Sequence, residues 1–477
     1  MVAILTEPLC LRAVLWFELD RRNAVSLTQQ LYDRLVSAVL TGTLRPGERL
    51  PSSRQFAHDL GIARNIVVEV FDQLQAEGYF VAVQGSGTFV ASLDLPVRTV
   101  ARTRSSPVDQ PRLPRADVIA FGCGIPELHS FPRARWLQAV RQAGFHGSRD
   151  LWSYDEAAGH RGLREEIAIH LGRTKGITCA ADQIVLTSGS AHGMLLLGLH
   201  FAQAGRRGAL IEDPVISFVP QAMRLTGHPI TPVRSDADGL VIEALPRRPR
   251  AGLVFISPSH QFPLGGTLPV SRRLALLQYS RKHDIFVIED DYDSEFRFEG
   301  APVSSLCRLD PTRVIHLGTF SKTLAPAMRL GYLVLPPGLA ADMVEMLRPL
   351  YIAGPKFSHE VMARFMRAGH FQRHITRMKR RYHRKMRVLS RALHEHFGDR
   401  VEINGHSTGL HVTVRFAGTT ITPEVREACR RAGVQFDTVD DYTVRRGRHS
   451  DLVLLGFGNL SAEQIETGIR RLATVLG

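Results

Sequence analysis

The sequence predicts a protein of two domains, a small winged helix-turn-helix followed by a larger α/β domain. In residues 20–93, three short amphipathic segments precede a glycine-rich hairpin. In residues 117–477, short apolar runs alternate with helical stretches, which is typical of a mostly parallel sheet covered by helices on both faces. Residues 94–116 contain four prolines and few large apolar side chains, so we expect an extended linker there.

The first domain is predicted from three helical segments and a hairpin. Residues 27–39 place an apolar side chain at every fourth position. Residues 52–60 open with a Ser-x-x-Gln capping box, and Gly61 ends the helix. Residues 63–77 carry apolar side chains along one face, and the β segments within residues 79–91 flank a Gln-Gly-Ser-Gly tip. Together these elements make a winged helix.

This arrangement predicts a surface that binds double-stranded DNA. The second helix of a helix-turn-helix lies in the major groove, where Arg64 can pair with guanine and Asn65 with adenine. The alternative is a winged helix that binds another protein through ordinary surface side chains. The expected DNA contacts are Ser53, Arg54, Arg64, Asn65, Gln84, Gly85, Ser86 and Gly87.

The formal charge of +14 lies mainly outside this domain, because seven arginines are balanced by seven acids between residues 20 and 93. Part of the excess lies in the linker. Another part lies in residues 373–387, which hold eight positive charges and no acid. This run has two interpretations, a solvated helix face or a nucleic-acid contact.

Composition favours a cytoplasmic protein. No apolar run approaches the roughly 18–20 residues of a membrane span, and residues 1–10 lack the features of a secretion signal. The five cysteines are scattered and never form a C-x-x-C pair, which argues against a disulfide or zinc framework.

The α/β domain is predicted from its apolar runs, with a smaller α+β portion at its C-terminal end. The expected strands of the main sheet are residues 183–187, 207–211, 252–256, 285–288, 314–317 and 332–335. The expected strands of the smaller portion are residues 410–416 and 452–456.

Lys322 has the sequence context of a lysine that forms a Schiff base with pyridoxal phosphate (PLP). Hydroxyl side chains precede it and an arginine follows seven residues later. PLP needs such a lysine, a carboxylate for its ring nitrogen and an anion cup for its phosphate. Acids at residues 289–291 follow a predicted strand, and a Ser-Gly-Ser turn at 188–190 precedes a predicted helix. Each element alone is common on protein surfaces, but their joint order indicates a PLP site.

The motifs also resemble known families. Leu44-Arg45-Pro46-Gly47-Glu48-Arg49-Leu50-Pro51-Ser52-Ser53-Arg54, Glu77-Gly78-Tyr79 and Gly85-Ser86-Gly87-Thr88-Phe89-Val90 resemble the GntR family of bacterial regulators. From residue 118 to about 476 the chain is similar to fold-type I aminotransferases. The whole chain resembles the MocR subfamily, which joins these two parts.

The resemblance implies a PLP-dependent transferase domain of fold type I, with Lys322 as the Schiff-base lysine. It implies Asp290 at the ring nitrogen, and both Tyr292 and Gln261 at the ring hydroxyl. Tyr154 resembles a tyrosine that reaches the phosphate bound by a second subunit, which implies a homodimer. The phosphate cup implied by the resemblance consists of Gly189, Ser190, Ala191, Thr319, Ser321 and Arg329.

The chain departs from the aminotransferase pattern at two places. Ile216 stands where the family often has a tyrosine beside the ring, with Phe218 as the aromatic side chain that could replace it. The residues around Leu454 are all apolar, whereas aminotransferases place a carboxylate-binding arginine there. Without this bidentate, charge-assisted contact, we expect little or no steady transamination of amino acids.

We therefore expect a PLP-dependent transcription regulator that binds operator DNA and senses a small molecule. Two alternatives remain open at this point. One is an active aminotransferase that carries a DNA-binding appendage. The other is a sensor whose effector is PLP itself, with no amine processed.

Overall fold

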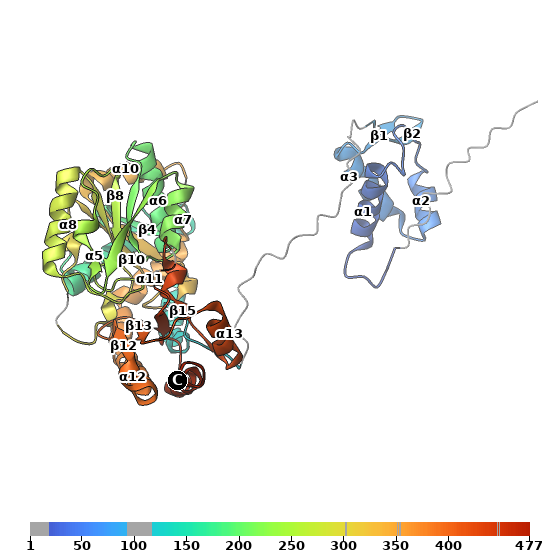
Figure 1. The fold of residues 1–477 in the computed structure, drawn as a ribbon. Helices are drawn as coiled ribbons and strands as arrows, with labels where there is room; N and C mark the ends of the chain where they lie inside the picture. Colours follow the sequence, from blue (N-terminus) through green and yellow to red (C-terminus); the bar gives the residue numbers. More distant parts are fainter. Residues whose placement is uncertain are drawn as a thin grey trace, which may run out of the picture. The chain divides into compact units, whose positions relative to one another are not determined.

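The computed structural model describes residues 19–92, 117–300, 303–350, 352, 354–445, 447 and 449–477. The chain divides into two compact units after Arg112 (Figure 1). The predicted linker, residues 94–116, lies outside the described residues, as does the N-terminal segment of residues 1–10. No helix in the described ranges is long and apolar enough to cross a membrane.

The first unit confirms the predicted winged helix. Its elements are α1 (Leu27–Leu40), α2 (Ser53–Leu60), α3 (Arg64–Ala76), β1 (Phe80–Val83) and β2 (Gly87–Val90). The Ser52 hydroxyl accepts a hydrogen bond from the Gln55 amide at 3.2 Å, which caps α2 as its sequence indicates. Gly61 then ends α2 in a left-handed conformation with φ of 63°, and β1 pairs antiparallel with β2.

The core of the first unit is built around Phe71 on α3. Its ring meets Phe56 of α2 and Phe80 of β1 edge-on, with centroids 5.5 Å apart in both pairs. Leu31 and Leu35 of α1 are fully buried in the same cluster. One aromatic residue therefore joins the helix-turn-helix to the wing.

The second unit contains a mixed eight-stranded sheet. Strands β10, β9, β8, β5 and β6 run parallel, whereas β11 is antiparallel to both β10 and β4. The strand order is β4 (Ile184–Thr187), β11 (Gly331–Val334), β10 (Val314–Thr319), β9 (Phe286–Asp291), β8 (Leu253–Ile256), β5 (Ala209–Asp213), β6 (Ile230–Asp236) and β7 (Gly239–Leu240).

The sheet differs from the sequence prediction in two respects. The run at 332–335 forms an antiparallel strand, an orientation that apolar content does not encode. Strands β6 and β7 were not expected, because the sequence of β6 mixes apolar and polar side chains and contains Pro232, and β7 has only two residues.

Helices cover both faces of this sheet, as predicted. One face packs against α6 (Ser190–Gln203), α7 (Phe218–Leu225) and α10 (Pro337–Leu347). The other face packs against α5 (Arg161–Lys175), α8 (Val270–His283) and α11 (Lys356–Arg367). The unit also contains α4 (Arg133–His146) and the short α9 (Leu306–Leu309).

The C-terminal portion is the expected smaller α+β part. Its sheet has the order β12 (Val401–Asn404), β13 (His411–Phe416), β16 (Leu452–Gly456) and β15 (Asp437–Thr438). Its helices are α12 (His370–Phe397), α13 (Pro423–Arg431) and α14 (Ala462–Leu476). The short strand β3 (Ile119–Ala120) pairs with β14 (Val434–Gln435), so the start of this unit joins its C-terminal portion.

The central position of Phe71 predicts that Phe71→Ala unfolds the first unit alone. Removing a buried aromatic ring costs about 3–5 kcal/mol, a large part of the stability of so small a core. Hydrogen exchange of the full chain should show lost amide protection within residues 27–90 and unchanged protection in the sheet of the second unit. Val68→Ala, on the outer side of α3, is the matched control and should retain protection. Retained protection in Phe71→Ala would contradict this account of the core.

Candidate functional site

A cavity of the second unit opens beyond the carboxyl ends of β9 and β10, and Lys322 lies in its wall three residues after β10. Parallel strands place their carboxyl ends at one edge of a sheet, where ligands of α/β proteins bind. Its lining residues are Cys123, Gly124, Ser190, Ala191, Ile216, Phe218, Phe262, Asp290, Tyr292, Asp293, Thr319, Ser321, Lys322, Pro326, Arg329, Leu410, His411 and Tyr442.

Three consecutive acids at the end of β9 have three different environments. Glu289 accepts hydrogen bonds from the Ser305 hydroxyl and from the Leu306 amide at 2.8 Å. Asp291 forms an ion pair with Lys175 at 2.6 Å. Burial opposes its ionisation, but the Lys175 ammonium outweighs burial and lowers the pKa of Asp291 to about 2. Glu289 and Asp291 therefore stabilise the fold through contacts with neighbouring residues, and neither lines the cavity.

Asp290 is the member of this trio that remains available to a ligand. It lines the cavity, and its Oδ1 has no hydrogen-bond partner among the described residues. Burial and the neighbouring charge of Asp291 raise the pKa of Asp290 to about 8. A cationic group in the cavity would stabilise its charged form and satisfy the unpartnered oxygen.

Lys322 faces this carboxylate from another wall of the same cavity. Burial lowers the pKa of the Lys322 ammonium, while the charges of Asp293 and Asp290 partly oppose that shift. A neutral amine is the nucleophilic form. Gly124 lies against its end, since a Cβ at position 124 would be 2.5 Å from Nζ. Glycine also suits position 124 because its φ is 73°, a conformation that other residues rarely adopt.

The N-terminus of α6 and the Arg329 side chain form an anion-binding corner. Gly189 precedes α6 with φ of 89°, and Ser190 begins the helix, so free amide groups and the helix dipole point towards the cavity. Arg329, itself in a left-handed conformation with φ of 45°, donates to the Ser188 carbonyl at 2.9 Å. Ala191, Thr319 and Ser321 complete this side of the cavity.

Two residues implied by the family resemblance lie elsewhere. The Gln261 side chain is fully buried and donates to the Pro214 carbonyl at 2.9 Å, so it supports a loop and does not line the cavity. Phe262 lines the cavity in its place. Tyr154 is 79% exposed and is likewise absent from the cavity wall of this single subunit.

Sequence reasoning missed a buried hydrogen-bonded chain beneath Tyr292. The Tyr292 hydroxyl donates to the His260 carbonyl at 3.0 Å and lies 3.1 Å from His260 Nδ1. His260 Nδ1 is also 2.9 Å from Asp293. His260, Asp293 and His411 offer metal-ligand atoms within 4.8 Å of one another. Because Asp293 already bonds His260, the geometry suits a hydrogen-bonded support that orients the tyrosine. The signal that could have indicated His260 was its position next to Gln261, which the family resemblance had placed near the ring hydroxyl.

One side of the cavity is apolar and aromatic. Ile216, Phe218 and Phe262 lie in its wall, with Phe218 present where the sequence suggested a replacement aromatic residue. Leu454 is fully buried in the cluster around Phe262. Arg329 is the one arginine among the lining residues, and it lies at the anion-binding corner.

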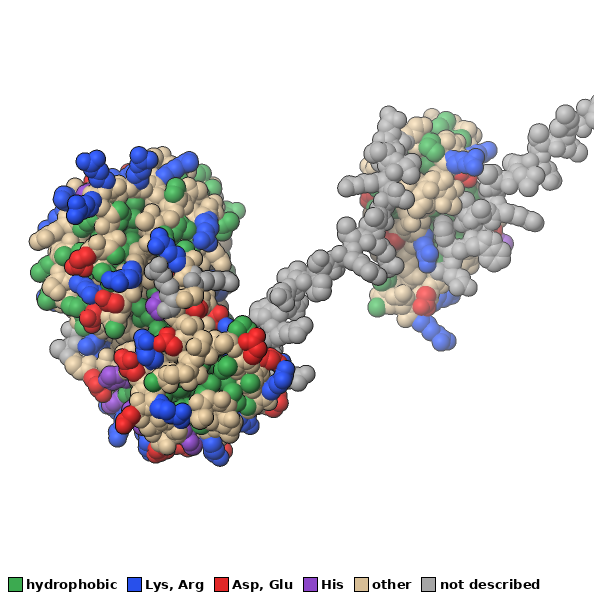
Figure 2. All heavy atoms as spheres, viewed as in Figure 1, with side chains coloured by type: hydrophobic (Ala, Val, Ile, Leu, Met, Phe, Trp, Pro, Cys, Tyr) green, Lys and Arg blue, Asp and Glu red, His purple; other side chains and the backbone are tan. Residues whose placement is uncertain are grey.

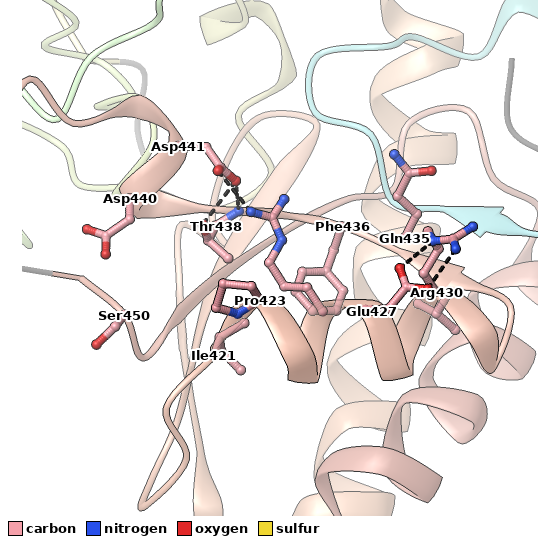
Figure 3. Close-up of a pocket in the computed structure, with 12 residues that line it drawn as sticks. Ile421, Pro423, Glu427, Arg430, Gln435, Phe436, Thr438, Asp440, Asp441 and Ser450 are labelled. Atoms are coloured by element: carbon pink, nitrogen blue, oxygen red, sulfur yellow. Dashed lines mark hydrogen bonds and ion pairs between the residues drawn. The ribbon is translucent and has the colours of Figure 1, made fainter. Parts of the chain in front are cut away.

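A larger hollow lies on the C-terminal portion, between α13 and the end of β15 (Figure 3). Its two arginines are paired with acids of the same hollow, Arg426 with Asp441 at 2.9 Å and Arg430 with Glu427 at 2.7 Å. It contains no lysine and no unpartnered buried group. The larger hollow therefore lacks the reactive groups of the smaller one. We take the cavity that contains Lys322 and Asp290 as the candidate site because of these groups and not because of its size.

The first unit presents the predicted DNA contacts on its surface. Arg54, Arg64 and Asn65 are exposed, and Arg64 Nε lies 3.4 Å from the Ser53 hydroxyl, so the starts of α2 and α3 lie together. The whole wing tip from Gln84 to Gly87, with Gly85 and Ser86 between them, is exposed as well. The Arg49 side chain lies beside Gly87 of the wing tip. Arg49 is a further cation near this tip that was not among the expected DNA contacts.

Comparison with known proteins assigns both units. The model of aminotransferase class I and II matches residues 116–444, and the model of the bacterial regulatory proteins of the gntR family matches residues 27–90. The kynurenine aminotransferase of Pyrococcus horikoshii is 25% identical with a TM-score of 0.69, and covers 76% of this chain and 91% of its own. A multiple substrate aminotransferase from Thermococcus profundus has the same TM-score at 26% identity, covering 76% of this chain and 92% of its own.

Relatives that match along nearly the whole chain contain both units. The probable rhizopine catabolism regulatory protein MocR of Rhizobium meliloti is 32% identical over 95% of this chain and 94% of its own length. The pyridoxine biosynthesis regulator PdxR of Corynebacterium glutamicum is 32% identical over 83% of this chain and 84% of its own.

Fold and site thus define an aminotransferase-like domain joined to a winged helix-turn-helix of the gntR type. The chain belongs to the GntR family of transcription regulators, and within it to the MocR-type regulators.

The unpaired state of Asp290 predicts a pH dependence of stability for the protein free of PLP. The unfolded chain releases this carboxyl proton near about pH 4, whereas the folded chain holds it up to about pH 8. Stability contributed by this group is therefore present below about pH 4 and is lost as pH rises to about 8. Asp290→Asn should gain thermal stability over the natural chain at the upper end of this window. The exposed Asp399→Asn is the control, and a difference that is constant with pH would contradict the account.

The placement of Arg64 predicts a specific loss of DNA affinity. Arg64→Ala should weaken binding by about 1–3 kcal/mol to a duplex that the natural protein selects from a random library. Fluorescence anisotropy measures the affinity, with Arg34→Ala on α1 as the control of equal charge. Unchanged binding by Arg64→Ala would show that this side chain does not read the groove.

Proposed function

We propose that this protein is a transcription regulator whose aminotransferase-like unit binds PLP covalently through Lys322 and uses it to sense a small molecule. One observation carries the proposal: a buried lysine and a carboxylate with an unpartnered oxygen line the same cavity. An anion-binding corner completes the set of groups that PLP needs.

The residues fit PLP by their chemistry. When bound, PLP supplies an aldehyde for amines and an electron-withdrawing ring. Lys322 would hold the aldehyde carbon, and Asp290 would accept a hydrogen bond from the ring nitrogen and keep it protonated. Tyr292, oriented by His260, would lie at the ring hydroxyl. The N-terminus of α6 and Arg329 would hold the phosphate.

The apolar wall supports a sensor with little or no steady turnover. An ordinary amino acid needs a cation for its carboxylate, and Arg329 would already hold the phosphate. Ile216, Phe262 and Leu454 offer no replacement. An amine without a carboxylate, or PLP itself, therefore suits the cavity better than an α-amino acid. The name of the relative PdxR, which refers to pyridoxine biosynthesis, favours PLP as the alternative effector.

Exposed aromatic side chains support a homodimer. Phe145 is 84% exposed, Trp152 is 69% exposed and Tyr154 is 79% exposed, and these three residues lie within ten positions of the sequence, so a second subunit would cover them. Trp152 stacks on Phe357 with centroids 5.4 Å apart, so the ring is held in place. Two copies would carry two winged helices and read two half-sites of cytoplasmic operator DNA.

Regulation requires the effector to bind two arrangements of the dimer with different affinity. An amine that replaced Lys322 at the aldehyde carbon of PLP would release the lysine amino group and so change its charge and its position. The cavity is therefore the place where such a difference in affinity would arise.

The proposal predicts that Lys322→Ala abolishes the visible absorption band of lysine-bound PLP and every effector-dependent change in DNA affinity. Basal DNA binding should remain, because the first unit folds around its own core. Titration with PLP and then with a panel of amines, followed by absorption and by anisotropy, measures both. Lys282→Ala, an exposed lysine on α8, is the control and should keep the band and the response.

The same titration separates the alternatives. A band that one amine shifts, together with DNA affinity, identifies a candidate effector class. DNA affinity that follows PLP alone would favour PLP as the signal. Steady conversion of amino donors to keto acids would establish an aminotransferase, and an effector response retained in Lys322→Ala would contradict covalent sensing.

A further inference from the structure

Helix α12 presents a row of arginines on its outer face. Its inner face packs into the core through buried side chains such as Phe371, Met378 and Leu389. The outer positions Arg380, Arg384 and Arg387 follow each other at steps of four and three residues, so they lie on one side of the helix. All three line a groove that also contains His383, Arg391, His394 and His406, with Glu299 as its acid. In Figure 2, Lys, Arg and His side chains lie among acidic ones at the end of the second unit that α12 occupies in Figure 1, so the pairing of each cation decides which of them are free.

These three arginines differ from three other cations of the same helix, which form ion pairs. Arg381 and Lys385 both pair with Glu127, at 3.0 and 3.1 Å. Arg391 pairs with Glu466 at 2.7 Å. Within the described part of the chain, by contrast, the structure shows no ion pair and no hydrogen bond for the side chains of Arg380, Arg384 and Arg387. The α12 arginine face, as we call these three residues, is therefore free to bind an anion.

The charge balance of the first unit indicates which anion. Its seven arginines and seven acids leave residues 20–93 neutral, although this unit carries the DNA-reading helix. Non-specific attraction to DNA depends on neutralising phosphates with Lys and Arg, and a neutral reader contributes little of it. The excess positive charge of the chain lies elsewhere, and the α12 arginine face is a concentrated, unpaired part of it.

We propose that the α12 arginine face binds the phosphate backbone of the duplex on which the winged helix is bound. The proposal rests on the proposed DNA-binding function and extends it to a second surface. Arg380 and Arg387 are separated by about 10 Å along the helix, at 1.5 Å per residue. Phosphates of one strand repeat about every 3.4 Å along the duplex axis, so this row meets two or more of them.

The chain between the two units is long enough for the winged helix and the α12 arginine face to bind the same duplex. The covalent chain from Leu93 to Asp117 can reach at most about 80 Å, from the extended length of a polypeptide. The contact we propose is therefore with DNA flanking the bases read by Arg64. A backbone contact of this kind adds affinity and positions the protein, and it carries no sequence information.

The test uses the full-length protein and a fluorescent random-sequence duplex of about 40 base pairs, whose binding depends on phosphate contacts. The test variant is Arg380→Gln, Arg384→Gln and Arg387→Gln combined. The matched control is Arg247→Gln, Arg248→Gln and Arg250→Gln combined, which removes the same charge from exposed arginines before β8. Thermal unfolding and PLP absorption verify that both variants retain the fold.

We expect the α12 variant to lose about tenfold or more in affinity at about 100 mM salt, and the control variant to lose much less. The slope of log affinity against log salt should become shallower by about 2.7 for three lost phosphate contacts. Equal losses in both variants would mean that net charge alone is responsible, and no loss in the α12 variant would overturn the proposal.

Two further outcomes distinguish this proposal from the proposed function. Arg64→Ala should lose affinity for a selected operator and keep its salt slope nearly unchanged on random duplex. If the α12 variant kept full affinity while Arg64→Ala lost it, DNA binding would stand and the second surface would be wrong. If the three arginines bound single-stranded RNA of equal length more tightly than duplex, the partner would be RNA and the proposal for DNA would be overturned.

Discussion

The ion pair between Lys175 and Asp291 is the constraint on which the candidate site depends. The Lys175 ammonium stabilises the charged form of Asp291, so this carboxylate can stay buried beside two other acids at the end of β9. Glu289 is held separately by Ser305 and nearby amides. The remaining carboxylate, Asp290, is then left facing a cavity with an unsatisfied oxygen. Three adjacent carboxylates would otherwise repel one another, and in this arrangement Asp290 is the one that lines the cavity and could contact a cation.

Much of this site could be predicted because local sequence encodes it. Lysine after hydroxyls, acids after a strand and a glycine turn before a helix are all contiguous signals, and the cavity contains Lys322, Asp290 and Ser190 together. Other lining residues come from segments far away in the sequence, such as His411 on β13 and Tyr442. No spacing rule connects these positions, so only tertiary packing identifies them.

The fold shows the same limit. The winged helix was predictable, because caps and turns determine each of its elements within about a dozen residues. The orientation of β11 was not predictable, because an apolar run indicates a strand but not whether it is parallel or antiparallel to its neighbours. Gln261 shows the limit at a single side chain: its neighbour Phe262 points to the cavity, while Gln261 points to the Pro214 carbonyl. Neighbouring residues of one loop thus have different roles, one in supporting the loop and one in lining the cavity, and the sequence does not show which residue has which role.

Gly124 lies beside the end of the Lys322 side chain, which places the lysine next to the first segment of the second unit. Gly124 lies four residues after β3, and β3 is held to β14 by main-chain hydrogen bonds on both sides. The Phe121 carbonyl also accepts from the Gly456 amide of β16. The lysine amino group thus lies beside a segment that main-chain hydrogen bonds hold to two strands of the C-terminal portion. The surroundings of Lys322 therefore depend on the anchoring of the first residues of the second unit as well as on the sheet that carries the lysine.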